Sequence, residues 1–365
     1  MIRRAKLFRS TKAAFAAAAL LTTASTVTAA AEETMREVNF FVVNSIFGTP
    51  VYVAAENGLW ASRGLNVKLR IMSSGRQVTQ ALQAGEAQLG HAAISTTTAA
   101  ARASGNLLKG VVPYYNAAEY VGKAGGRAII GRKDRGIDPG NPNSFLGKTV
   151  AILTGSTNEV YIKEWLRQKG VDQSKIKFVS VPIEDMPITL RQGLVDAVAS
   201  WEPYSAQIVR ELGPNAAIVS RGEAGIISDV VGAVANETWL LTNRASVEEF
   251  AAGLAEASQI VRKNPDEAAT ILTRYLDGVN VKDAAEAVRL GNWDPRISIC
   301  TSAGLVKTGN DMIKAGLIKM DKPFVATDFY DPAILDQVQK HHPEFFDDLP
   351  PLPTTLAECK GQLAP

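Results

Sequence analysis

Short apolar runs alternate with amphipathic stretches in the first part of the chain. Thr49 and Ser74 are residue types that cap the start of a helix, and Gly64 and Gly85 are of the type that ends one. The pattern therefore predicts one β-loop-α-β-loop-α-β unit. The expected strands lie at 38–43, 67–71 and 89–94, and the expected helices at 50–63 and around 78–82.

The same layout returns about a hundred residues later. Gly170 and Gly193 are expected to end the two helices of this second unit. Strands that alternate with helices form parallel sheets with helices on both faces. The sequence thus predicts an α/β protein with two lobes of similar design. The second unit has expected strands at 149–153, 176–181 and 195–200, and helices that reach 169 and 192.

The remaining residues are expected to be mainly helical. Extended segments at 230–234 and 239–242 would return the chain to the first lobe. Ser246 with Glu249 has the spacing of a capping box, and the Asn264-Pro265 pair suits a helix start. A Pro-rich segment at 349–355 is expected to be extended. The other expected elements are helices at 204–212, 247–263, 265–276, 281–290 and 301–315, and a strand near 218.

The first 31 residues differ from the rest. Residues 1–12 hold five basic groups and no acidic one, residues 13–21 are apolar, and Ala29-Ala30-Ala31 offers a small-residue cleavage site. This is the pattern of a secretory signal peptide, and the apolar run is too short to span a bilayer. We expect ordinary secretion rather than the twin-arginine route that Arg3-Arg4 would suggest, with cleavage after Ala31.

Cleavage changes the charge of the chain. The whole sequence has a formal charge of +2, from 39 basic and 37 acidic residues. Loss of five basic residues leaves 34 against 37, so the 334-residue product has a charge of −3. No basic tail for nucleic acid remains, and no nucleic-acid partner is expected.

Two cysteines, Cys300 and Cys359, occur in the sequence. In an oxidising compartment the favoured interpretation is one disulfide that ties down the C-terminal tail. The alternative is a pair of unpaired buried thiols.

Candidate ligand contacts follow from the predicted sheets. In open parallel sheets ligands bind beyond the carboxyl ends of the strands. The loops at those ends are rich in Ser, Thr and Asn and precede helices, whose free N–H groups favour anions. These loops are residues 44–49, 73–76, 95–98, 154–158, 182–185 and 201–202. The candidate ligand-binding residues in or near them are Ser45, Thr49, Ser74, Arg76, Ser95, Thr96, Tyr114, Ser156, Thr157, Asn158, Trp201 and Glu202.

Each candidate has a structural alternative, because Ser, Thr and Asn cap helices with or without a ligand. Arg76 would clamp an anionic group or remain solvated. Trp201 and Glu202 would wall and polarise a pocket, or the Trp would pack while the Glu caps the next helix. Tyr114 would stack on a ligand or pack at a hinge. His91 lies in an apolar strand and is expected to be a core imidazole.

Motifs of catalysis are missing from the sequence. It has no G-x-S-x-G elbow, Walker A loop or H-E-x-x-H motif, and no His/Cys cluster that suggests zinc. Only three histidines occur, two of them adjacent, so a catalytic one would have to be His91. We expect neither an enzyme nor a cofactor.

Several segments resemble the nitrate/sulfonate/taurine-type solute-binding proteins of ABC transporters, over about residues 38–330. They are PVYVAAENGLW at 50–60, RGLNV at 63–67, LGKTV at 146–150 with Gly155-Ser156 after it, and GLVDA at 193–197 with Trp201-Glu202-Pro203-Tyr204 after it. One departure is Gln88, where the first lobe of such proteins usually carries Asp; the matching second-lobe position keeps Asp196.

The resemblance implies a type II periplasmic binding protein fold, with two Rossmann-like lobes joined by two crossover segments near 127–133 and 232–239. Residues 32–128 and 236–365 would form the first lobe, and residues 129–235 the second.

It also implies function. The chain would be a periplasmic, monomeric component of an ABC importer. It would bind a small anionic or zwitterionic organic solute (sulfonate-, taurine- or nitrate-like, or a carboxylate) and deliver it to a membrane permease driven by an ATPase. One alternative is a pyrimidine-synthesising enzyme on the same fold, whose cysteine-rich motif is missing here. Another is a binding protein that feeds a sensor kinase.

Overall fold

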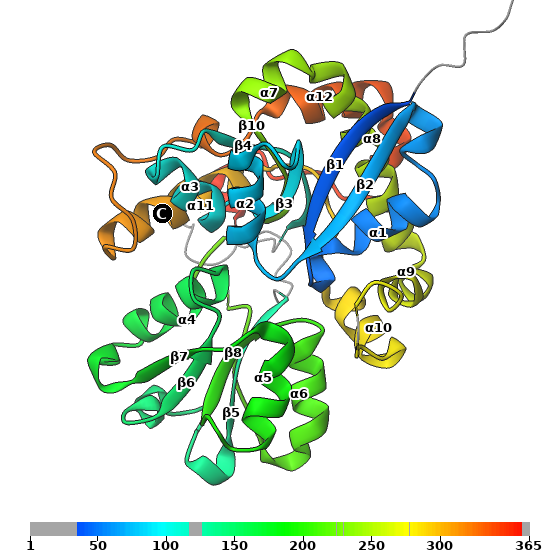
Figure 1. Cartoon of the computed structure of the whole chain (residues 1–365). Coiled ribbons are helices and arrows are strands. Elements are labelled where there is room, and N and C mark those ends of the chain that lie inside the picture. Colours follow the sequence, from blue (N-terminus) through cyan, green and yellow to red (C-terminus); the bar gives the residue numbers. More distant parts are fainter. Residues whose placement is uncertain (1–34, 117–125, 224, 229, 277, 360–365) are drawn as a thin grey trace, which may run out of the picture. The chain divides into compact units, whose positions relative to one another are not determined.

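Two five-stranded sheets organise the residues that the computed structural model describes (Figure 1). These residues are 35–116, 126–223, 225–228, 230–276 and 278–359, within one compact unit that begins at Met35. The expected signal peptide at 1–31 lies outside the described residues. None of the described helices is both long and apolar enough to cross a bilayer.

The first sheet is mixed. β1 runs parallel to β2 and β3, whereas β10 runs antiparallel to β3 and β4. Its strands, in spatial order, are β2 (Leu65–Met72), β1 (Arg36–Val43), β3 (Leu89–Ala93), β10 (Val230–Asn236) and β4 (Leu108–Asn116). The purely parallel sheet expected from the sequence is therefore wrong, because a strand from far along the chain inserts beside β3. That strand is the extended segment expected to return to the first lobe.

The second sheet repeats this design. β6 runs parallel to β7 and β8, and β5 runs antiparallel to β8 and β9. Its strands, in spatial order, are β7 (Lys177–Ser180), β6 (Thr149–Ile152), β8 (Ala197–Trp201), β5 (Arg127–Arg132) and β9 (Ala216–Arg221). In both sheets the inserted antiparallel strand is fourth in the order.

Helices cover both faces of the first sheet. Phe40 of β1 packs against Trp60 and Phe250 on one face. On the other face, Gly90 of β3 lies directly against Val78 and Leu82, so a Cβ at this position would overlap α2. The helices that precede β5 are α1 (Thr49–Glu56), α2 (Gly75–Ala84) and α3 (Thr96–Ala103).

Successive side chains of a strand in the second sheet point to opposite faces and join different cores. In β5, Ala128 and Ile130 join the large core that continues from the first lobe, whereas Ile129 joins a smaller core with Trp165 of α4. Both faces are therefore covered. The helices of this part are α4 (Thr157–Gln168), α5 (Met186–Arg191) and α6 (Tyr204–Leu212).

The chain after β10 is mainly helical, as expected. The helices here are α7 (Glu237–Thr242), α8 (Arg244–Lys263), α9 (Pro265–Leu272), α10 (Val281–Leu290), α11 (Ile299–Lys314) and α12 (Pro332–His341). Four details of the sequence prediction are wrong. The helix expected at 50–63 ends at Glu56, and a separate 3-10 helix covers Ala61–Arg63. Residues 239–242 are helical, Ser246 lies inside α8, which begins after Asn243, and Thr49 is the first residue of α1 rather than its cap.

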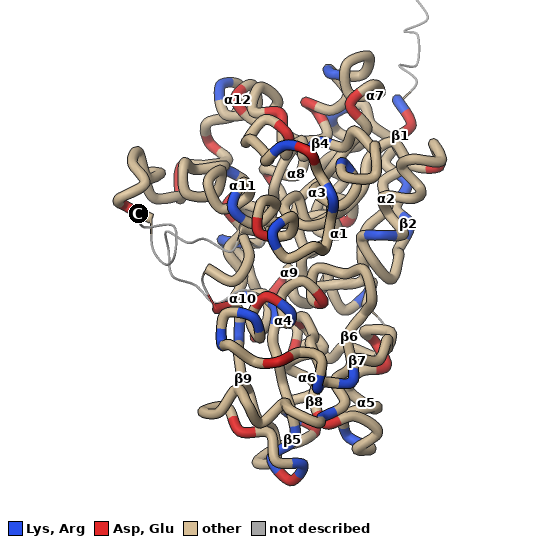
Figure 2. Tube along the Cα trace, turned by 90° about the vertical axis from the view of Figure 1, so that its left-hand side faces the viewer, with Lys and Arg blue, Asp and Glu red and all other residues tan. Residues whose placement is uncertain are grey.

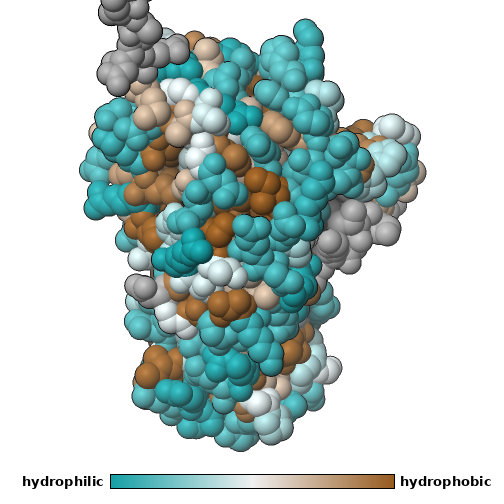
Figure 3. All heavy atoms as spheres, turned by 90° about the vertical axis from the view of Figure 1, so that its right-hand side faces the viewer, coloured by the Kyte–Doolittle hydropathy of each residue, from teal (hydrophilic) through white to brown (hydrophobic). Residues whose placement is uncertain are grey.

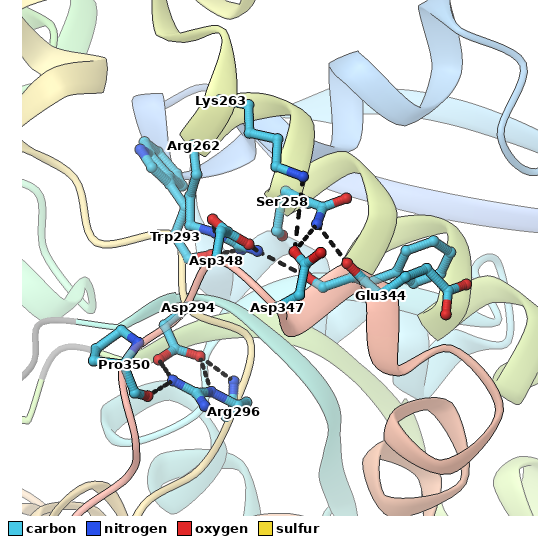
Figure 4. A network of polar contacts seen from close by, with 12 residues as sticks. Ser258, Arg262, Lys263, Trp293, Asp294, Arg296, Glu344, Asp347, Asp348 and Pro350 are labelled. Atoms are coloured by element: carbon cyan, nitrogen blue, oxygen red, sulfur yellow. Dashed lines mark hydrogen bonds and ion pairs between the residues drawn. The ribbon is translucent and has the colours of Figure 1, made fainter.

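Polar contacts tie the C-terminal tail to this part of the fold (Figure 4). Arg262, in the last turn of α8, donates to the carbonyl oxygen of Trp293 and pairs with Asp348 at 2.7 Å. Arg296 pairs with buried Asp294 and donates to the carbonyl oxygen of Pro350. Farther along, a disulfide joins Cys300 of α11 to Cys359, which is the favoured of the two expected alternatives.

The chain passes between the sheets at two places. The first lies between Asn116 and Arg127, and the second between Arg221 and Val230. Both are a few residues earlier than the expected crossovers near 127–133 and 232–239, because β5 and β10 are already complete sheet members. The assignment of 32–128 with 236–365 and of 129–235 to two lobes stays a prediction, with β10 as the exception that the sheet order shows.

Candidate functional site

Strand ends and helix starts from both sheets meet around a narrow pocket, here called the inner pocket. Its free volume is about 30 Å³, room for two or three water molecules. The described residues that line it include two arginines and no acidic residue. They are Val43, Ser45, Phe47, Gly75, Arg76, His91, Ala92, Ala93, Thr97, Arg127, Gly155, Ser156, Thr157, Trp201 and Val231.

Ser156 lies in this pocket because it caps α4. Its Oγ accepts a hydrogen bond from the backbone N–H of Glu159, and Gly155 before it has a positive φ that lets the chain turn into the helix. Thr157 follows as the first helical residue, and its Oγ1 lies 2.6 Å from Oγ1 of Thr96 in α3. The start of a twelve-residue helix thus faces the pocket with hydroxyls and a positive dipole end.

Arg127, at the start of β5, brings a buried positive charge to the same pocket. Its guanidinium donates to Oδ1 of Asn158 at 2.8 Å and lies over the ring of Phe47, 5.0 Å from the centroid. These two contacts orient the group, so that the pocket has a positioned cation as well as polar hydroxyls.

His91 forms part of the floor. Its Nδ1 lies 2.6 Å from the hydroxyl oxygen of Tyr114, which is fully buried in β4. Burial, and secondarily the charge of Arg127, lower the pKa of His91 to about 3. The imidazole is therefore neutral at physiological pH, and the positive charge nearby comes from arginine.

Trp201 ends β8 and contacts the residue that follows β1. Its indole N–H donates to the carbonyl oxygen of Asn44, which also accepts from the Tyr204 hydroxyl through its side chain. The carboxylate of Glu202 is turned away into the protein, where Oε2 accepts from the N–H of Ala206. Burial raises the pKa of Glu202 to about 7, against the opposing effect of Arg221 at 3.6 Å.

A larger space, here called the outer chamber, adjoins the inner pocket. Its free volume is about 460 Å³, and it shares Arg76, Thr97, Gly155, Ser156 and Thr157 with the inner pocket. Its other lining residues are Thr79, Gln80, Gln83, Thr96, Ala100, Ala101, Ser104, Asn106, Glu159, Val160, Met312, Leu317 and Ile318.

The structure brings about half of the candidate residues together. Those that line the inner pocket are Ser45, Arg76, Ser156, Thr157 and Trp201, and Thr96 lines the outer chamber. Of the others, Asn158 accepts a hydrogen bond from Arg127, and the Tyr114 hydroxyl lies at hydrogen-bond distance from His91.

Six candidates line neither space, and Tyr114 and Asn158 are two of them. Ser74 caps α2 and Glu202 caps the start of α6, which is the structural alternative for each. The Thr49 hydroxyl donates to the carbonyl oxygen of Ile46, and Ser95 is fully buried. The loop at 182–185 also lines neither space.

Sequence reasoning missed Arg127 and the pocket role of His91. Two further lining residues, Phe47 and Thr97, lie in loops that the sequence analysis selected, although it did not name them. The sequence thus predicted the loops around the pocket better than the individual residues. Arg127 had no signal of its own, because it follows a crossover and comes to the pocket only through the antiparallel insertion of β5. Among the described residues, no group of three or more His, Cys, Asp or Glu side chains could hold a metal ion.

Solved structures with similar folds include three binding proteins. The periplasmic aliphatic sulphonate binding protein SsuA from Escherichia coli is 18% identical, over 81% of this chain and 97% of that chain, with a TM-score of 0.66. The alkanesulfonate-binding protein SsuA from Xanthomonas axonopodis pv. citri, bound to MOPS, is 16% identical over 80% and 97%, with a TM-score of 0.67. The nitrate-binding protein NrtA from Synechocystis PCC 6803 is 13% identical over 88% and 92%, with a TM-score of 0.68.

At these identities the likeness shows the fold. No curated protein sequence matches the chain. A family model described as "NMT1/THI5 like" matches residues 47–268, more than half of the sequence. The chain therefore has the type II periplasmic binding protein fold that the sequence predicted, and it belongs to the NMT1/THI5-like family.

Proposed function

We propose that this protein is the periplasmic solute-binding component of an ABC importer, and that it binds a small organic anion between its two sheets. The observation that carries the proposal is the composition of the inner pocket. It combines Arg127 and Arg76 with the Ser156 hydroxyl, and its described lining contains no acidic side chain. Positioned cations, hydroxyls and a helix start together favour a sulfonate or carboxylate head group.

The neutral state of His91 fits this proposal. Next to Arg127 a charged imidazole would add a second buried cation, whereas the neutral ring can donate or accept a single hydrogen bond. Trp201 supplies an apolar wall for the part of the solute beside the head group. A zwitterion such as taurine is the less favoured ligand, because no described carboxylate of the inner pocket would meet its amine.

Export and delivery complete the proposal. The leader-like residues 1–31 would direct the chain to the periplasm, where it would act as a monomer and meet the permease. Ligand binding would favour the closed arrangement, which the permease recognises, and the transporter ATPase would supply the energy. The scatter of both charge signs along the trace fits a protein without a nucleic-acid partner (Figure 2).

The experiment is ligand-dependent thermal unfolding and calorimetry of the purified mature protein with alkanesulfonates, carboxylates, nitrate and taurine. A ligand at about a hundred times its Kd stabilises the folded state by about 2.7 kcal/mol. Absence of any shift across the panel would contradict the proposed ligand class.

Two variants test the location. Trp201→Ala and Ser156→Ala should weaken binding, and the second also removes a helix cap that contributes about 1 kcal/mol of stability. Glu202→Gln is the matched control, because its side chain faces away from the pocket. Equal affinity of all three variants and the parent would move the site elsewhere. Chemical conversion of a bound ligand by the purified protein would favour the enzyme alternative.

A further inference from the structure

We propose that the outer chamber is a second subsite for the same solute, which makes the solute a two-part organic anion rather than a compact one. This inference rests on the proposed function. The inner pocket, at about 30 Å³, has room for little more than a head group, whereas the outer chamber has about 460 Å³. Drug-sized ligands occupy spaces of several hundred Å³.

The two spaces adjoin at the residues that would hold the head group. Arg76, Ser156 and Thr157 line both. The Arg76 side chain crosses from α2 toward the second sheet, since a Cβ on Gly155 would lie 3.2 Å from its Cδ. A head group bound by Ser156 and the arginines would therefore leave its substituent pointing into the outer chamber.

The walls of the outer chamber define the chemistry of that substituent. Part of the lining, on α2 and α3 and after the end of α3, carries hydroxyl and amide groups, among them the side chain of Gln80. Another part of the lining is apolar, with Val160 of α4 and Met312, Leu317 and Ile318. A substituent that fits has hydrogen-bonding atoms along one edge and an apolar face along the other.

The charged side chains that line the outer chamber are Arg76, which would hold the head group, and Glu159, which is already engaged. Glu159 accepts from the N–H of Gly155 and pairs with Lys163, so it is not available for a cationic substituent. The substituent is therefore uncharged, and the solute carries its charge at the head group.

The apolar wall depends on the end of α11. Gly316, with φ of 69°, ends this helix in a left-handed turn, and the N–H of Leu317 bonds back to the carbonyl oxygen of Met312. This turn places Leu317, which is 38% exposed, at the chamber rather than on the next turn of a continuing helix.

The test compares ligands that share one sulfonate head group: methanesulfonate, hexanesulfonate and MOPS, whose morpholine ring has polar atoms and apolar faces. Calorimetry should show MOPS at least tenfold tighter than methanesulfonate, because roughly 100 Å² of apolar surface would leave water. Hexanesulfonate should lie between them, since it lacks hydrogen-bonding atoms for the Gln80 wall.

Variants locate the effect. Leu317→Asp should lower MOPS affinity about tenfold and Gln80→Ala about fivefold, with methanesulfonate affinity unchanged in both. Leu241→Asp is the matched control, because Leu241 is 76% exposed and lines neither space. Thermal unfolding of the ligand-free variants checks that each is folded.

The outcomes separate the two proposals. If the parent protein binds none of the three sulfonates, nitrate or carboxylates, the proposed function fails and the inference falls with it. If it binds methanesulfonate as tightly as MOPS, or if Leu317→Asp binds MOPS like the parent, the proposed function stands and the second subsite is overturned.

Discussion

In both sheets a side chain just before a strand accepts a hydrogen bond from the backbone N–H of a neighbouring strand. The residue that does so differs between the two sheets. In the first, Oε1 of Gln88 accepts a hydrogen bond from the N–H of Asn39 in β1, at 2.8 Å. In the second, Oδ2 of Asp196 accepts from the N–H of Thr149 in β6, also at 2.8 Å. The departure at Gln88 from the usual Asp of the resembling family is thus conservative in function: an amide oxygen replaces a carboxylate oxygen as the acceptor.

The sheets differ in what surrounds them. The first is covered by α8 and α12 as well as by its own crossover helices, and the tail is joined to the same part of the chain through Cys300 and Cys359. The second depends on α4, α5 and α6. Surface apolar patches are separated by hydrophilic residues in the view of Figure 3. The comparison indicates that the shared design serves the pocket, while α8 and α12 add cover to the first sheet. Of the later helices, α10 also reaches the second part, where Asp283 pairs with Arg210 of α6 at 3.0 Å.

Removal of the disulfide should have the largest effect and should separate the two parts. The bond joins residues 59 apart, for which loop-closure entropy predicts a loss of about 4 kcal/mol in the free energy of unfolding. Urea unfolding of the double variant Cys300→Ala/Cys359→Ala measures the loss. Amide exchange should quicken in α11 and much less in β6, and equal quickening in both would show that the tail stabilises the whole protein.

The inserted strands provide the next comparison. A Cβ on Gly232 of β10 would overlap the carbonyl oxygen of Val112 and lie 2.7 Å from Cα of Pro113, which are backbone atoms that cannot move alone. A Cβ on Gly131 of β5 would lie 2.5 Å from the Ile137 side chain. We expect Gly232→Ala to cost about 3 kcal/mol and Gly131→Ala about 1–2 kcal/mol.

Urea unfolding of the two single variants tests this order. In a double-mutant cycle with Ile137→Ala, the cost of Gly131→Ala should shrink, because that substitution removes the Cγ1 and Cγ2 atoms at the overlap. Equal costs at both glycines would contradict the distinction between backbone and side-chain neighbours.

The pH dependence of stability should also differ between the sheets. Glu202 follows β8 and Ile94 follows β3, each two residues before a helix, and both are buried. Burial raises the pKa of Glu202 from 4.5 to about 7, so the folded protein binds a proton that the unfolded chain releases. Stability from this group is present below pH 4.5 and is lost as the pH rises toward 7.

The loss amounts to roughly 2–3 kcal/mol between pH 4.5 and 8, at about 1.4 kcal/mol per pKa unit. Urea unfolding at pH 5 and pH 8 measures this. The free energy of unfolding of Glu202→Gln, relative to that of the parent, should be higher at pH 8 than at pH 5. Ile94→Val is the control, with a loss of about 1 kcal/mol at both values. A difference between Glu202→Gln and the parent that stays constant with pH would refute the assignment.

The smallest change in stability is expected at Gln88 and Asp196, the equivalent hydrogen-bond acceptors of the two sheets. Gln88→Ala should cost about 1 kcal/mol, and Asp196→Ala about 2 kcal/mol because its acceptor is a charged group. Gln88→Glu, which keeps the acceptor oxygen, should stay within about 0.5 kcal/mol of the parent. Chemical denaturation of the three variants measures these differences, and a large cost for Gln88→Glu would show that the amide nitrogen matters too.

Local chemistry explains why much of the fold was predictable. Apolar runs of strand length, cap residues such as Ser74 and Ser156, and stop signals such as Gly85 and Gly170 act on neighbours in the sequence. The repeated β-loop-α-β-loop-α-β layout, and with it the set of loops beside the pocket, could therefore be derived. The start expected at Ser246 was misplaced because the helix already begins at Arg244, directly after Asn243.

By itself the sequence determined two α/β units and a set of polar loops. It also showed that these loops contain many hydroxyl groups that can cap helices and few groups typical of catalysis. Only the tertiary structure decided which of those groups face one another. Insertion of β5 and β10 as antiparallel fourth strands carries Arg127 and Val231 to the pocket. The Glu202 side chain turns away from the pocket and accepts from the N–H of Ala206. The physical reason is that strand order and direction depend on contacts between residues far apart in the chain, whereas caps and periodicity depend on residues within one or two turns.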